Sequence, residues 1–124
     1  MPLKNFYDLE AWKRGHALVL SVYMLTKKYP SEEKFGLSNQ SRRAAVSVTS
    51  NISEGFGRNS QNDKKHFYSM AKTSLAELQN QMIIARDLHY ITPAEFQKIL
   101  QQGIHVDKLI AGLIKSAPSK NTHT

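Results

Sequence analysis

The amino-acid sequence predicts an all-α protein built as an antiparallel, up-down-up-down four-helix bundle. Apolar residues recur at intervals of three and four along four segments, and no segment alternates apolar and polar residues with a period of two. Only short turn signals separate the four segments, so successive helices are expected to run in opposite directions. A chain of 124 residues corresponds to one domain. We therefore expect residues 1–118 to form the bundle and residues 119–124 to form a disordered polar tail.

The first helix is expected to run from about Asp8 to Tyr29, with Asp8 as its N-cap. Its apolar face follows the same three-four spacing, and Pro30 ends it. His16 falls on that face, which favours a hydrogen-bonded histidine in the core or in a subunit interface.

The second helix is expected to begin at Glu32 or Ser38 and to end at Gly55, and Gly36 leaves its first turn undefined. Its inward face consists of Ala, Ser and Val rather than Leu. Side chains this small allow a neighbouring helix to come close, so the pattern predicts a tight helix contact. We expect the glycines of Gly55-Phe56-Gly57 to end the helix, with a glycine in the left-handed conformation.

The third and fourth helices carry N-terminal capping signals. Ser60 is expected to cap the third helix, which should end near His89, and Asp63 takes the position at which a capping box usually has Glu or Gln. The fourth helix is expected to begin at Thr92-Pro93-Ala94-Glu95, which combines an N-cap threonine, a proline at the first helical position and a glutamate three residues after the cap. Pro118 marks its expected end.

The composition predicts a basic cytoplasmic protein. The 17 Lys and Arg residues exceed the 10 Asp and Glu residues and give a formal net charge of +7, which favours a polyanionic partner such as nucleic acid. The absence of cysteine excludes disulfides and thiolate metal sites. The best apolar run, Ala17–Leu25, is far shorter than the ~20 residues that a membrane span requires, and the N-terminus has no apolar stretch typical of a signal peptide. We expect no membrane partner.

The sequence contains no motif that indicates catalysis or a cofactor. The five histidines include no pair at the i,i+4 spacing, and Asp63-Lys64-Lys65-His66 is the single segment that approaches the Glu-x-x-His pattern of a di-metal bundle. No serine lies in a Gly-x-Ser-x-Gly elbow, and no phosphate-binding loop of the Gly-x-x-x-x-Gly-Lys-Ser/Thr type occurs. We therefore expect a non-enzymatic protein with no metal and no cofactor.

Basic residues cluster at two places and form the predicted nucleic-acid-binding set. Its members are Arg42 and Arg43 early in the second helix, and Arg58, Lys64 and Lys65 around the turn that follows it. The two arginines lie near a helix start, where cations are disfavoured, so they require a partner. Two alternatives stay open: the arginines pair with Glu32, Glu33 or a carboxylate of another subunit, or they bind phosphate. Arg58 has a closer candidate partner, because Glu54 precedes it by four residues.

Several apolar residues lie outside the single stripe that a monomeric bundle requires. Leu20 on the first helix, and Leu100 and Ile104 on the fourth, are of this kind. They are the predicted contacts of a homo-oligomer interface.

Specific segments of the chain resemble a known bacterial family. The most specific lies in the second helix, where Arg42–Ser47 is followed by Ser50–Gly55. Asp8–His16, Gly36–Gln40 and Leu75–Gln79 support it. Together they resemble the rRNA intervening-sequence proteins, also known as S23 ribosomal proteins. Thr49 departs from the proline that many members have there, so the kink expected of such a proline is in question.

The resemblance implies a four-helix bundle that assembles as a homopentamer and has no known catalytic activity. A similar fold is expected in the accessory variability determinant of diversity-generating retroelements, a basic pentamer that works with a reverse transcriptase and nucleic acid. We therefore expect an oligomer that contacts RNA or DNA phosphates through its basic surface. The alternative is a protein-interaction scaffold, for example an accessory subunit of a reverse transcriptase, without direct nucleic-acid contact.

Overall fold

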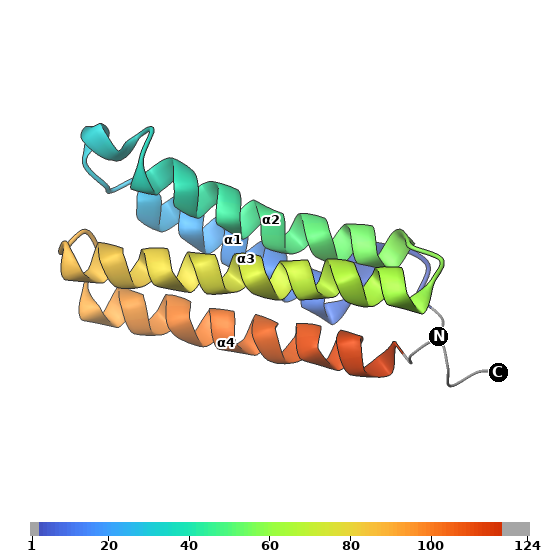
Figure 1. Cartoon of the computed structure of the whole chain (residues 1–124). Helices are drawn as coiled ribbons and strands as arrows, with labels where there is room; N and C mark the ends of the chain where they lie inside the picture. The colour runs from blue at the N-terminus through green and yellow to red at the C-terminus, as the bar shows by residue number, and fades with distance from the viewer. Residues whose placement is uncertain (1–2, 118–124) are drawn as a thin grey trace.

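Residues 3–117 are described by a computed structural model of the chain, and they form a bundle of four α-helices (Figure 1). The helices are α1 (Glu10–Thr26), α2 (Leu37–Gly57), α3 (Gln61–Asp87) and α4 (Pro93–Ser116), with two short 3-10 helices, η1 (Phe6–Asp8) and η2 (Ser31–Glu33). Residues 3–117 contain no strand, which confirms the predicted all-α class. The predicted polar tail, residues 119–124, lies outside the described residues.

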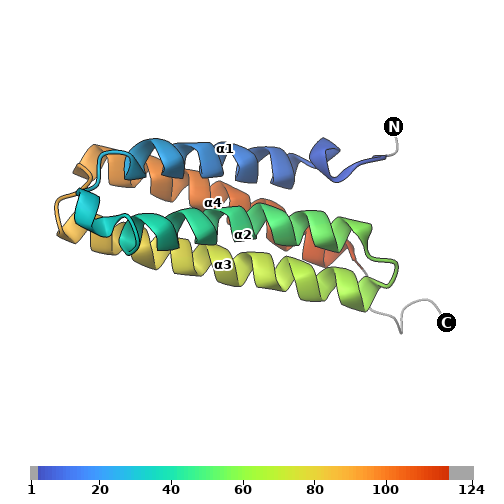
Figure 2. The same ribbon diagram turned by 90° about the horizontal axis from the view of Figure 1, so that it is seen from above.

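The four helices lie side by side, and the turns between them alternate between the two ends of the bundle (Figures 1 and 2). α1 packs chiefly against α2 and α4, and α3 packs chiefly against the same two helices. The α1–α2 and α3–α4 connections meet at one end, where the Tyr90 hydroxyl donates to the Glu33 carboxylate over 2.8 Å. Lys28 and Glu95 form an ion pair at the same end.

The α2–α3 contact is as close as the small side chains of α2 predicted. Ala45 and Val48 of α2 and Ala71 of α3 are completely buried. The hydroxyls of Ser47 and Ser74 form a hydrogen bond of 2.8 Å between the two helices. Asn51 donates to the Ser47 carbonyl and hydroxyl at 2.9 and 3.1 Å, so it supports this contact through Ser47.

α2 also packs closely against α1 on its other side. A Cβ added at Gly15 of α1 would lie 3.0 Å from the Thr49 methyl group. Thr49 lies inside the uninterrupted helix Leu37–Gly57, and its hydroxyl donates to the Val46 carbonyl over 3.0 Å. The threonine side chain therefore fits its own helix and the glycine opposite.

The two predicted caps are confirmed. The Ser60 hydroxyl accepts the Asp63 N–H at 3.0 Å. At the start of α4, the Thr92 hydroxyl accepts the Glu95 N–H at 3.1 Å, and the Glu95 carboxylate accepts the Thr92 N–H at 2.9 Å. Each cap satisfies N–H groups that have no partner inside their helix.

Two predicted features of the first two helices are wrong. Asp8 does not cap α1: it belongs to η1 and accepts the Asn5 N–H at 3.1 Å, while Leu9 precedes the helix. The glycines of the Gly-Phe-Gly segment do not adopt the left-handed conformation, because no glycine in residues 3–117 has a positive φ. Gly55 is helical instead, and its missing side chain leaves room for the buried ring of Tyr68, whose Cε1 would lie 2.5 Å from an added Cβ.

The other helix ends differ from the prediction by a few residues. α1 ends at Thr26 rather than Tyr29, α2 continues to Gly57, and α3 ends at Asp87 rather than His89. His89 has a φ of 62°, the left-handed conformation that ends a helix. α4 ends at Ser116, just before the predicted stop at Pro118.

Candidate functional site

The five predicted nucleic-acid-binding residues lie in two separate groups. Arg42 and Arg43 lie in the first half of α2, and Arg58, Lys64 and Lys65 lie at the α2–α3 turn. The 16 residues from Arg42 to Arg58 correspond to about 24 Å along a helix. One chain therefore does not bring the five residues together in one surface.

Two of the three cations at the α2–α3 turn have partners within the chain. Arg58 forms the expected ion pair with Glu54, with 2.9 Å between Nη2 and the carboxylate, and its guanidinium lies 4.4 Å from the ring centroid of Phe67. The Lys64 amine donates to the Gly55 and Phe56 carbonyls at 3.3 and 2.7 Å. Lys64 therefore binds the C-terminal end of α2, where exposed carbonyls favour a cation.

Among the described residues, Arg42 has neutral partners only. Its Nε donates to the Thr26 hydroxyl over 2.8 Å, and its guanidinium carbon lies 4.7 Å from the ring centroid of Tyr23. The Thr26 hydroxyl in turn donates to the Val22 carbonyl at 2.8 Å, which fixes its orientation. Arg42 is thus held in place while its charge stays unneutralised.

Glu32 and Glu33 do not neutralise the two arginines. Within residues 3–117, neither Arg42 nor Arg43 forms an ion pair with a carboxylate. The Glu33 carboxylate accepts the Leu37 N–H at 3.0 Å and the Tyr90 hydroxyl at 2.8 Å. The two arginines are also the sixth and seventh residues of α2, beyond the first turn to which the helix dipole is largely confined.

A hollow with three cations lies between the end of α1 and the start of α2. Its volume is about 390 Å³, and its lining contains no carboxylate. Its cations are Lys27, Lys34 and Arg42, its hydroxyls come from Thr26, Ser31 and Ser38, and Tyr29 and Pro30 complete it. We call it the basic hollow. Neither Lys27 nor Lys34 is among the five predicted residues, and it is the folding of η2 between the two helices that brings Lys34 to the same hollow as Arg42.

Hydrogen bonds fix the segment that carries Lys34. Because Glu33 accepts the backbone hydrogen bond from Leu37 and the one from Tyr90, the pKa of its carboxyl lies below the ordinary value of 4.5. A Cβ on Gly36 would lie 2.8 Å from the Glu33 carboxylate, so glycine is the residue that leaves room for this contact. Tyr29 also lines the basic hollow, and its hydroxyl keeps its proton because burial and the nearby Glu95 and Glu33 raise its pKa to about 12.

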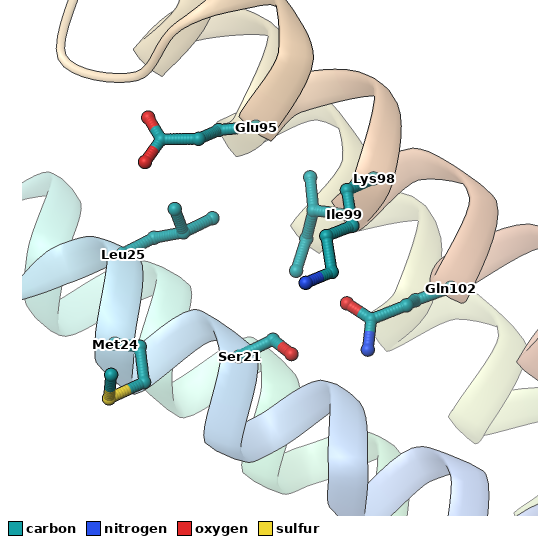
Figure 3. A pocket seen from close by; sticks show the side chains of 7 residues that line it. All are labelled: Ser21, Met24, Leu25, Glu95, Lys98, Ile99 and Gln102. Atoms are coloured by element: carbon teal, nitrogen blue, oxygen red, sulfur yellow. The ribbon is translucent and has the colours of Figure 1, made fainter.

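A second hollow, of about 270 Å³, lies between α1 and α4 (Figure 3). Ser21, Met24 and Leu25 of α1 and Glu95, Lys98, Ile99 and Gln102 of α4 line it. Its polar groups are of mixed charge. Met24 is 65% exposed, and Leu20, a predicted interface residue one turn before it, is 54% exposed. The other two predicted interface residues, Leu100 and Ile104, are half-buried.

Within residues 3–117, the histidines take part in no cluster that could hold a metal ion. His16 is exposed and stacks on Trp12 with 4.8 Å between ring centroids, so the prediction of a core histidine is wrong. Its alternative placement, in a subunit interface, stays a prediction. Among the described residues, no three His, Asp or Glu side chains are grouped closely enough to hold a metal ion. Over the same range, no helix combines the length and the apolar character that crossing a membrane requires.

These features define a helical-bundle protein with a carboxylate-free basic hollow at one end. The chain belongs to the 23S rRNA-intervening sequence protein family, whose sequence profile matches residues 7–112. This confirms the family that the second helix indicated. No curated protein matches the chain.

A solved structure shows the same fold. It is the crystal structure of a protein of unknown function from the S23 ribosomal protein family of Bacteroides thetaiotaomicron VPI-5482. Its TM-score against this chain is 0.78 at 23% sequence identity, and the match covers 85% of this chain and 95% of the other. The relation to the accessory variability determinant stays a prediction.

Proposed function

We propose that the protein is a non-enzymatic, oligomeric bundle that binds RNA or DNA phosphates through the basic hollow. The observation that carries this proposal is the lining of the hollow, which joins Lys27, Lys34 and Arg42 without a carboxylate. The net charge of +7 and the rRNA-related family support it. The proposal includes an antiparallel up-down-up-down arrangement of the helices, assembly as a homopentamer and a cytoplasmic location.

The contacts of Arg42 suit it to phosphate. Because the Thr26 hydroxyl and the Tyr23 ring hold the guanidinium without neutralising it, little side-chain freedom is lost when an anion binds. The guanidinium forms charge-assisted, often bidentate hydrogen bonds with phosphate. Ser31 and Ser38 add hydroxyl donors at the same place. The exposed Arg43 follows Arg42 and extends the charge beyond the hollow.

The other basic group, Arg58, Lys64 and Lys65, is an auxiliary contact in this proposal. The charge of Arg58 is offset by Glu54, and Lys64 is bound to the end of α2. Lys65 is half-buried and forms no ion pair within residues 3–117. We therefore expect this group to contribute less to affinity than the basic hollow.

The test is the salt dependence of binding to a structured RNA. Each neutralised phosphate contact contributes about −0.9 to the log–log slope on duplex DNA and about −0.7 on single strands. Arg42→Ala with Arg43→Ala should weaken binding and flatten the slope. Arg58→Ala with Lys65→Ala is the comparison, because it also removes two positive charges, at the other end of the bundle, and should weaken binding less. Absence of binding at low salt, or unchanged affinity and slope in the first double variant, would contradict the proposal.

A protein-interaction scaffold is the second candidate, and the exposed apolar residues beside the α1–α4 hollow favour it. Leu20 and Met24 are 54% and 65% exposed and lie one turn apart on α1. A scaffold, such as an accessory subunit of a reverse transcriptase, would use this face for protein contacts and pair its arginines across subunits. In that case Arg42→Ala with Arg43→Ala would dissociate the oligomer, which sedimentation velocity detects directly.

A further inference from the structure

The turn between η2 and α2 carries an aromatic ring that is almost completely exposed. Phe35 is 86% exposed, more than any other large apolar residue among those described. The turn lies at one end of the bundle (Figure 1). The Lys34 amine lies 5.6 Å from the Phe35 ring centroid, and Lys34 also lines the basic hollow. One lysine therefore borders both the ring and the hollow.

The residues on both sides of Phe35 are anchored, so its exposure follows from the local fold. On one side, Glu33 holds the Leu37 N–H and the Tyr90 hydroxyl, at 3.0 and 2.8 Å. On the other side, Leu37 is buried in the core with 8% exposure. Only Lys34, Phe35 and Gly36 lie between these anchors. A turn this short, closed by the Gly36 N–H donating to the Glu33 carbonyl over 3.0 Å, holds the ring outside the core.

We infer that this end of the bundle binds single-stranded nucleic acid, with a phosphate in the basic hollow and an unpaired base stacked on Phe35. This inference rests on the proposed function and specifies its ligand. Aromatic rings next to cations are the combination that binds single strands, because the ring stacks on a base and the cations bind the backbone. Inside a duplex, the bases are already stacked on each other, so away from the duplex ends the ring has no free base face to cover.

The surroundings of Phe35 favour a polyanion over an apolar protein surface. Glu32 and Lys34, which lie close to Phe35 along the chain, are exposed and charged, so charged side chains rather than further apolar ones flank the ring in the sequence. Glu32 carries the one exposed carboxylate of η2, and it does not line the hollow. The hollow itself holds three cations. Charge complementarity therefore selects a phosphate backbone as the occupant.

The experiment compares two RNA probes on the whole 124-residue chain. One is a single-stranded oligonucleotide without self-complementarity, and the other is the duplex that it forms with its complement. Phe35→Ala should lower affinity for the single strand about ten-fold or more and leave affinity for the duplex unchanged. Tyr7→Ala is the control, because Tyr7 is another exposed aromatic residue, 50% exposed, on η1. It should change neither affinity.

A second variant reports stacking directly. Phe35→Trp should keep the single-strand affinity, and its added fluorescence should be quenched by the single strand but not by the duplex. The native Trp12 provides the background, measured with the unsubstituted protein. Circular dichroism confirms that each variant is folded.

The outcomes separate this inference from the proposed function. Unchanged single-strand affinity in Phe35→Ala, or equal losses for both probes, overturns the inference, while salt-dependent binding that requires Arg42 and Arg43 still supports the proposed function. A change of sedimentation coefficient in Phe35→Ala also overturns it, because the ring then belongs to a protein contact. If the unsubstituted protein binds neither probe at low salt, both proposals fail.

Discussion

Gly55 illustrates how a single missing side chain determines the contact between two helices. It lies on α2 opposite the buried ring of Tyr68, and an added Cβ would lie 2.5 and 2.8 Å from two ring carbons. Tyr68 is 4% exposed and cannot easily move aside. We therefore expect Gly55→Ala to lower the free energy of unfolding by about 1–3 kcal/mol, the usual cost of overpacking, as measured by urea denaturation.

Gly112 is the matched control for this substitution. It is exposed within α4, and nothing lies within 4 Å of an added Cβ. Gly112→Ala should raise the free energy of unfolding by about 0.5–1 kcal/mol, because alanine is the better helix former. Equal effects of the two substitutions would show that helix propensity, and not the Tyr68 contact, determines the result at Gly55.

Glu33 links stability to pH at the end of the bundle that carries the basic hollow. Its pKa is lowered in the folded protein by the hydrogen bonds from Leu37 and Tyr90, so the unfolded chain binds the proton more tightly. The stabilisation is therefore complete above the ordinary value of 4.5 and is lost as the pH falls through the lowered folded value. The pKa of Glu95 is also lowered, chiefly by the hydrogen bond from Lys28, so Glu95 contributes to stability in the same pH range.

We expect Glu33→Gln to reduce stability at neutral pH and to weaken its dependence on pH below 4.5. Thermal unfolding at a series of acidic pH values measures both effects. Glu77→Gln is the control, since Glu77 is exposed and forms no ion pair in the described part of the chain. Parallel pH profiles for the unsubstituted protein and Glu33→Gln would contradict this account.

Lys64 and Lys65 are neighbours at the start of α3, but they differ in their contacts with the end of α2. Lys64 donates to two terminal carbonyls of α2, whereas Lys65 forms no ion pair within residues 3–117. We expect Lys64→Gln to lower the free energy of unfolding by about 1 kcal/mol and Lys65→Gln to leave it unchanged. Chemical denaturation measures the free energy of unfolding of the two variants, which carry the same net charge. A larger loss in Lys65→Gln would reverse the assignment.

The helices themselves could be predicted from the sequence because their patterns are local. Ser60 and Thr92 cap α3 and α4 as expected, since a cap depends on residues within one turn. The end of α2 could not be predicted, because Gly55 does not end the helix: it leaves room for the ring of Tyr68 on the next helix. His16 was misplaced for a similar reason: the apolar periodicity of α1 does not reveal how wide its buried face is.

The candidate site was predicted only in part. Arg42 was identified by its charge, and the structure adds the neutral partners that leave this charge free. Lys34 and Phe35 were missed, because their significance depends on a three-dimensional turn anchored by Glu33 and Tyr90, residues 57 positions apart. The short sequence segment around them carries no motif, although an aromatic residue next to a lysine in a helix connection is a weak signal.

At the scale of the whole bundle, the two ends differ in how many of their cations have partners within the chain. The end with the α1–α2 and α3–α4 connections holds the basic hollow and Phe35, and the hydrogen bond between Tyr90 and Glu33 joins its two connections. At the other end, Arg58 and Lys64 are bound within the chain. If the first end binds phosphate as proposed, an oligomer that places copies of it near each other would strengthen binding, because linked sites bind with a high effective concentration.

We expect such an oligomer to form through the face beside the α1–α4 hollow. A substitution of Leu20, which lies on this face, tests that expectation. The side chain is 54% exposed and lies one turn from the exposed Met24. A carboxylate placed in an apolar subunit interface is costly unless it is paired, so Leu20→Glu should shift the protein to a smaller species in sedimentation velocity. Leu88→Glu is the control, because Leu88 is similarly exposed, 49%, at the C-terminal end of α3. If Leu20→Glu sediments like the unsubstituted protein while Leu88→Glu dissociates, the interface lies at the end of the bundle and would compete with nucleic acid there.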